Sequence, residues 1–76
     1  MQYDYSKLWG AIAERYGTQS KFSKAIGISE HSISQKMNCK IGWKQSEILR
    51  ICELLNIPHK DISKYFFTLK VQQNWT

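Results

Sequence analysis

The sequence predicts an all-α protein, a compact bundle of four to five short helices that includes a helix-turn-helix. Three observations predict this fold class. Apolar residues recur at three- and four-residue steps through most of the chain, which is the period of an amphipathic helix. Glycines stand where these stretches end, at the usual place of a left-handed helix cap. Hydrophobic residues form 42% and aromatic residues 13% of the 76 residues, which is enough for one packed domain and more than disordered chains carry.

The first helix is predicted from about Tyr5 to Tyr16, with Asp4 or Ser6 as its N-terminal cap. Gly10 lies inside this helix at a cost of about 1 kcal/mol relative to alanine, which we attribute to close packing at that position. The residues at helical spacing form an apolar stripe: Tyr5, Leu8, Trp9, Ile12, Ala13 and Tyr16.

Two shorter helices are predicted next, with Thr18 capping residues 19–26 and Ser29 capping residues 30–37. Gly27 breaks the chain between them. Their inward faces are expected to consist of Phe22, Ala25, Ile26, Ile33 and Met37. Left-handed caps are expected at Gly17, Gly27 and Gly42, because each follows a helix-like stretch.

Residues 38–43 are predicted as a loop and residues 44–55 as a fourth helix with a broad apolar arc. Pro58 cannot continue that helix and can open a short fifth helix at about residues 59–66. Cys52 is expected to fill the core, and His59 to be an exposed residue of the first turn.

The C-terminal segment of residues 67–72 alternates apolar and polar side chains, which predicts a strand or an extended arm. A lone strand is not stable in water, so an ordered segment would pack on the helices or pair with a second chain. We therefore divide the chain into a single helix-turn-helix domain of residues 1–67 and a tail of residues 68–76 that is a candidate dimer arm.

The charge of +5 is concentrated in the middle of the chain. A basic block in a folded domain is typical of a protein with a polyanionic partner, although it can also be a solvated face. Between residues 15 and 44 the block contains one acidic residue, Glu30, and six basic residues: Arg15, Lys21, Lys24, Lys36, Lys40 and Lys44.

Catalytic, cofactor and metal functions find no support in the sequence. The six carboxylates show no paired arrangement, no glycine-rich phosphate loop is present, and the spacing of Cys39 and Cys52 fits no zinc pattern with His31 or His59. No signal peptide and no apolar stretch of membrane-spanning length is found. We expect a protein of the cytoplasm that is not an enzyme and binds neither cofactor nor metal.

The helix-turn-helix itself is predicted for residues 19–38. Two helices joined by a short turn that contains glycine define this motif. Gly27 permits a positive φ, while Ile26 and Ile28 flank the turn and Ile33 holds the second helix against the first. With Ile33 inward, the exposed face of the second helix carries hydrogen-bonding groups of the kind that meet base edges in the major groove: His31, Ser32, Gln35 and Asn38.

These residues resemble the helix-turn-helix of the phage Cro and lambda-repressor-like family. The resemblance is carried by Gln19, Phe22, Ile26-Gly27-Ile28-Ser29 and Ile33-Ser34, and residues 42–48 resemble small Cro-like phage regulators in particular. The family usually has alanine where this chain has Ser23, a mild departure because serine is nearly as small and can bond back to its own helix.

The resemblance implies a role for each matching residue. Glu30, His31 and Gln35 match positions that read bases, although each has an ordinary alternative: His31 and Gln35 as solvated polar residues, and Glu30 as a partner of the helix dipole. Gln19 matches a phosphate contact at a helix N-terminus, and Ser29 and Asn38 match further phosphate positions. Flanking lysines are expected to contact phosphates as well: Lys21, Lys36, Lys40 and Lys44.

The predicted function is sequence-specific binding of double-stranded DNA by a small Cro-like repressor, in a bacterial or phage-infected cell. One copy reads only a few base pairs, so we expect a homodimer, at least on DNA, on a pseudo-palindromic operator. The alternative is a helix-turn-helix modulator that binds a protein, as an antirepressor or an antitoxin does. The aromatic segment Tyr65-Phe66-Phe67 and Trp75 could supply the surface for such a partner.

Overall fold

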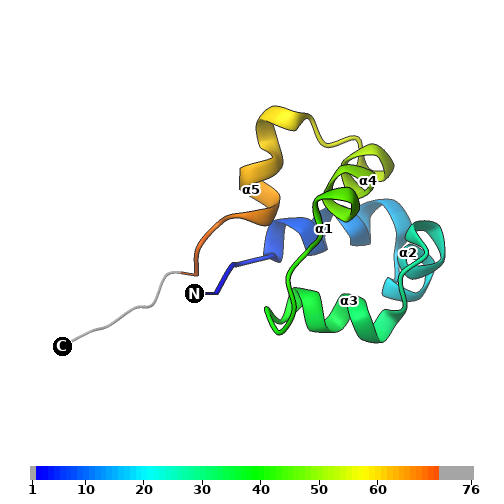
Figure 1. Cartoon of the computed structure of the whole chain (residues 1–76). Helices are drawn as coiled ribbons and strands as arrows, with labels where there is room; N and C mark the ends of the chain where they lie inside the picture. The colour runs from blue at the N-terminus through cyan, green and yellow to red at the C-terminus, as the bar shows by residue number, and fades with distance from the viewer. Residues whose placement is uncertain (1, 71–76) are drawn as a thin grey trace.

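The computed structural model describes residues 2–70 and confirms the predicted all-helical bundle (Figure 1). No helix in the described part is long and apolar enough to cross a membrane. Within residues 2–70, five α-helices and one 3₁₀ turn follow one another: α1 (Ser6–Tyr16), α2 (Gln19–Ile26), α3 (Glu30–Met37), α4 (Gln45–Leu55), η1 (His59–Asp61) and α5 (Ile62–Phe66).

The core forms around α1, which contacts α2, α4 and α5, while α2 also contacts α3 and α4. Most residues of the expected apolar faces of α1, α2 and α3 are buried, and Cys52 of α4 lies in the core as predicted, but Ala13 of the predicted stripe on α1 is exposed. The two tryptophans in the described part, Trp9 and Trp43, are half-buried against this core. The largest fully buried side chains come from all five helices: Leu8, Ile12, Phe22, Ile33, Ile51 and Phe66.

Two of the predicted helix caps are confirmed. Thr18 accepts a hydrogen bond from the Lys21 amide at 3.2 Å, and Ser29 accepts one from the Ser32 amide at 3.2 Å. Gly27 ends α2 in the left-handed region with φ 78°. The corner between α2 and α3 is therefore built from local interactions that the sequence already indicates.

The start of α1 resolves the choice between Asp4 and Ser6. Asp4 Oδ1 accepts hydrogen bonds from the amide and the hydroxyl of Ser6, so Asp4 supplies the capping carboxylate one residue before the formal N-cap, Tyr5. The hydrogen bond from the Ser6 hydroxyl, followed by that from its amide, holds the pKa of Asp4 below its ordinary value of 3.8. Close packing does not explain Gly10, which is exposed and has open space where a Cβ would stand.

The left-handed residue after α3 is Cys39, with φ 61°, and not Gly42. The expectation of a glycine cap there was wrong because a tertiary contact compensates for the backbone strain. The Tyr3 amide lies 3.3 Å from Cys39 Sγ, and the thiol donates to the Tyr3 carbonyl at 3.4 Å. Asn56 takes the same left-handed role after α4, with φ 55°; asparagine adopts this conformation more readily than most residues.

The segment after α5 pairs with the N-terminus of the same chain, an arrangement that the sequence did not indicate. Tyr3 and Leu69 form an antiparallel bridge, Asp4 donates its amide to the Thr68 carbonyl at 2.6 Å, and Lys70 donates to Gln2 at 3.1 Å. The two chain segments run side by side at the edge of the bundle (Figure 1). The predicted strand extends to residue 72, and its last two residues, like Trp75, lie outside the described residues.

Candidate functional site

The helix-turn-helix is formed by α2, the turn of residues 27–29, and α3. Ile33 is fully buried and Met37 nearly so, which orients α3 as the pattern predicted. Ser23 departs from the expectation that it bonds back to its own helix: its hydroxyl donates to the Ile28 carbonyl. The Ser23 hydroxyl therefore links α2 to the turn, an interaction that an alanine at this position could not make.

The three residues assigned to base reading lie where the sequence placed them, on the outward side of α3. Glu30 and His31 are exposed and Gln35 is half-buried. Gln35 Nε2 lies 3.2 Å from His31 Nε2, so the two side chains form one hydrogen-bonded pair. A pair of this kind offers donors and acceptors to any polar partner and is not by itself specific for DNA.

The residues matched to phosphate contacts use their donors inside the protein. Gln19 Nε2 donates to the Glu30 carbonyl at 2.9 Å and to the Ser34 hydroxyl at 3.0 Å. Asn38 Nδ2 donates to the Ser34 carbonyl at 2.9 Å, and the Ser29 hydroxyl serves as a cap for α3. These bonds fix α3 against α2 and satisfy helix ends, which is a structural role for all three side chains.

Lys36 is the clear correction among the site residues, because it is only 5% exposed. Its ammonium lies 3.0 Å from Glu47 Oε1, donates to the Gly42 carbonyl at 3.2 Å, and is 5.5 Å from the centre of the Trp43 ring. It joins α3 to the loop and to α4, and does not present its charge to a phosphate. The sequence spacing indicates this burial: Lys36 stands three residues after Ile33 and therefore lies on the same inward face of α3.

Glu47 receives two favourable interactions in this cluster. Burial alone raises its pKa, but the Lys44 amide at 2.8 Å and the Lys36 ammonium together lower the pKa below the ordinary 4.5. The ion pair also cancels one charge of the basic block. The lysines that remain exposed around α2 and α3 are Lys21, Lys24, Lys40 and Lys44.

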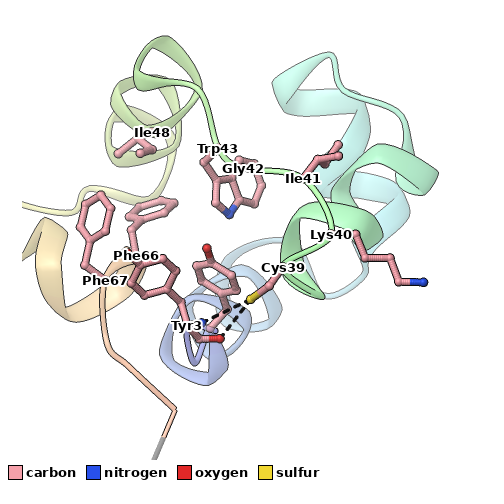
Figure 2. A pocket seen from close by; sticks show the side chains of 10 residues that line it. Tyr3, Cys39, Lys40, Ile41, Gly42, Trp43, Ile48, Phe66 and Phe67 are labelled. Carbon is pink, nitrogen blue, oxygen red and sulfur yellow. Dashed lines mark hydrogen bonds between the residues drawn. The ribbon is translucent and has the colours of Figure 1, made fainter. Parts of the chain in front are cut away.

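A groove on another side of the molecule was not predicted (Figure 2). It has a volume of about 330 Å³ and lies between the N-terminal segment, the α3–α4 loop, the start of α4 and the end of α5. We call it the aromatic groove and define it by six of the side chains that line it: Tyr3, Cys39, Ile41, Trp43, Ile48 and Phe67.

Of the aromatic segment suggested for a protein partner, Phe66 and Phe67 both line the aromatic groove, and Phe67 is the exposed one. Phe67 is 49% exposed there, whereas Phe66 is fully buried in the core and Tyr65 is half-buried. The sequence named these three residues as a group but could not separate core from surface, because that depends on how the end of α5 packs against the N-terminal segment.

Comparison with known proteins identifies relatives of this chain. The model of the family DUF739, described as a protein of unknown function, matches residues 1–69. The solution structure of the modulator of repression (MOR) of the temperate bacteriophage TP901-1 from Lactococcus lactis is similar, with 49% sequence identity and a TM-score of 0.78. The match covers 95% of this chain and 97% of that one. No protein in the curated set matches.

These findings support a relation to phage regulators, which is the broader part of the sequence-based prediction. Neither match names the Cro and lambda-repressor-like family, so membership of that family stays a prediction.

Proposed function

Because the chain belongs to the DUF739 family and is 49% identical to a phage modulator of repression, we propose that it modulates transcriptional repression by binding a protein, namely a repressor. The observation that carries this proposal is the match over 95% of the chain, with 49% sequence identity and a TM-score of 0.78. The alternative function inferred from the sequence thus becomes the first candidate.

The chemistry of the α3 face supports this choice. Specific DNA binding draws much of its affinity from cations on phosphates. Here Lys36 is withdrawn into an ion pair, and Gln19 and Asn38 donate to the protein's own backbone. What α3 presents is the carboxylate of Glu30 beside the hydrogen-bonded pair of His31 and Gln35, a mixed polar surface suited to another protein.

DNA binding is the second candidate, and the geometry of the α2–α3 corner favours it. The turn at Gly27 and the cap at Ser29 give α3 the form of a recognition helix, and Lys21, Lys40 and Lys44 remain exposed around it. Under this candidate two copies would bind a pseudo-palindromic operator, with Glu30, His31 and Gln35 facing the bases.

The test is a pair of titrations of the purified full-length protein. One titrates the repressor encoded in the same genome, and the other the operator duplex of that repressor, each at about 50 mM and about 200 mM salt. We expect the repressor to bind at both salt concentrations and the duplex alone to bind weakly and without regard to sequence. Sequence-specific binding of the duplex that falls steeply with salt, together with no binding of the repressor, would establish the DNA candidate instead.

Two variants separate the candidates at the residue level. If α3 reads bases, Gln35→Ala should cost about 1–3 kcal/mol and relax one base position, whereas Lys40→Ala should weaken all duplexes alike and reduce the salt slope by about one. If the partner is a protein, neither variant should change discrimination between duplexes. Neither candidate involves catalysis, a cofactor or a metal, and both place the protein in the cytoplasm.

A further inference from the structure

We propose that the aromatic groove holds a short segment of a protein partner in which a large apolar side chain stands next to acidic residues. This inference shares with the proposed function only the premise that the partner is a protein. It goes further in naming the aromatic groove, rather than the α3 face, as a surface that binds the partner.

The walls of the groove suit an apolar side chain. Phe67 and Ile41 are 49% and 42% exposed, among the most exposed large hydrophobic residues in the described part of the chain. The Phe67 ring meets the Tyr3 ring edge-on at 5.8 Å, so the wall is a rigid aromatic pair. Rigid aromatic surfaces lose little conformational entropy on binding, and aromatic residues are enriched at the centres of interfaces.

An unused hydrogen-bond donor faces the interior of the groove. Trp43 Nε1 is buried, yet no acceptor lies within hydrogen-bonding distance of it among residues 2–70. Figure 2 shows this nitrogen turned inward, toward the side where Cys39 and Tyr3 lie. An indole nitrogen can only donate, and buried polar groups in proteins nearly always have a partner. Because this nitrogen has almost no accessible surface, the indole has to turn slightly toward the groove on binding, and a main-chain carbonyl of the bound segment then supplies the acceptor.

The charges around the groove favour an acidic partner. Among residues 2–70, Lys40 is the one charged side chain that lines it, and Figure 2 shows its amine extending outward from the rim. Lys44 and Lys70 are exposed on bordering segments. Of the carboxylates on these segments, Glu47 is paired with Lys36, whereas Asp4 keeps its charge, accepts hydrogen bonds from Ser6 and is near the cationic Lys70. A carboxylate beside the inserted apolar side chain therefore meets a rim of positive potential.

The volume of about 330 Å³ is at the lower end for ligand pockets. It admits one or two large side chains and the main chain that joins them, with the acidic neighbours left outside at the rim. Such a segment uses every feature of the groove at once: the apolar walls, the Trp43 donor and the outward lysine.

The first experiment selects binders from a random library of linear peptides displayed against the full-length protein. We expect enriched peptides to combine a large apolar residue with Asp or Glu within a few positions. The strongest peptide is then added to ¹⁵N-labelled protein, where the indole N–H signal of Trp43 should move downfield as it gains an acceptor. Enrichment of basic peptides, or a Trp43 signal that stays in place, overturns the proposal.

Matched variants locate the binding site. Phe67→Ala and Ile41→Ala should each weaken the selected peptide about tenfold or more, because they remove exposed walls of the groove without touching the core. Leu49→Ala is the control, since Leu49 is 39% exposed on α4 and does not line this groove; its affinity should change less than about twofold. Equal losses for all three variants contradict the proposed site.

Two further measurements identify other occupants. If the Trp43 signal of the free protein shifts with protein concentration, a second copy fills the groove; if it shifts in Trp75→Ala, the chain's own C-terminal segment does. Either result overturns the proposal. The selected peptide should also displace the repressor from the protein. If the repressor binds and the peptide does not displace it, the groove assignment alone is overturned. If the repressor does not bind at all, the proposed function alone is contradicted.

Discussion

The position of Lys36 changes the functional interpretation of the basic surface around α3. Counted along the sequence, it belongs to a basic block that faces a polyanion. In the fold its ammonium bonds Glu47 and the Gly42 carbonyl and lies against the Trp43 ring. This cluster connects α3 with the loop and with α4, so its charge stabilises the position of α3 and is not available to a partner.

Breaking the Lys36–Glu47 pair should destabilise the protein measurably. Lys36→Met leaves the Glu47 carboxylate without its main partner, and we expect a loss of about 2 kcal/mol, below the ~3–5 kcal/mol of fully buried pairs because Glu47 is partly exposed. The double variant Lys36→Met/Glu47→Gln should recover part of this loss, since no uncompensated charge remains. Urea denaturation of the single and double variants measures both quantities, and strictly additive losses would contradict the pairing.

The same carboxylate predicts how stability depends on acid. The pKa of Glu47 is lower in the fold than its ordinary 4.5, so the folded state binds its proton less readily than the unfolded chain does. The resulting stability is fully present above pH 4.5 and is lost as the pH falls through the lowered folded pKa. Glu47→Gln should flatten this part of the profile in denaturant melts between about pH 5 and pH 2, whereas Asp4→Asn, at an exposed site, should alter it less.

At the scale of the elements, some helix ends are determined by local sequence signals and others by tertiary contacts. Thr18, Ser29 and Gly27 behave as their residue types predict. After α3, however, a cysteine occupies the left-handed position that a glycine was expected to hold, because the N-terminal segment bonds its thiol. A helix end is thus predictable from sequence when its partners are within a few residues, and not when they come from the far end of the chain.

Two glycines of adjacent helices should respond to alanine in opposite directions. Gly10 has open space at its Cβ position and lies inside α1, so Gly10→Ala should raise the free energy of unfolding by about 0.5–1 kcal/mol through helix propensity. Gly27 has φ 78°, so Gly27→Ala should lower it by about 1–2 kcal/mol through left-handed strain. Thermal melts of the two variants test this, and a destabilising Gly10→Ala would indicate a contact that the structure lacks.

For the whole molecule, the pairing of the two ends of the described chain creates the aromatic groove. Tyr3 bridges to Leu69, and its ring meets that of Phe67. Without this pairing the groove would lose the wall that Tyr3 and Phe67 form. This groove exists only in the folded protein, because segments from both ends of the described chain form it.

The end pairing should be detectable by hydrogen exchange. The Lys70 amide donates to the Gln2 carbonyl and the Asp4 amide to that of Thr68, so both should exchange more slowly than in an unstructured chain. Tyr3→Ala removes the ring that holds the two segments together and should speed exchange at both amides. Amides in the middle of α4 serve as the control and should keep their protection; a loss there as well would mean that the bundle itself had been weakened.

The outward face of α3 could be predicted from the sequence because Ile33 and Met37 fix the rotation of the helix. The same reasoning placed His31 and Gln35 together, as the structure has them. Lys36 was placed wrongly because its charge was given more weight than its position beside Ile33. The groove could not be predicted, because Tyr3, Trp43 and Phe67 are brought together only by the packing of segments far apart in the chain.

The order of residues along the chain was sufficient to determine the five helices, the Gly27 corner and the inward stripe, because these depend on backbone preferences and on the 3.6-residue period. The tertiary structure decided which charges stay exposed, which residue adopts the left-handed backbone conformation after α3, and where apolar surface remains exposed. The physical reason is that these properties depend on contacts across long sequence separations, whose free energy can exceed the preference of any single residue.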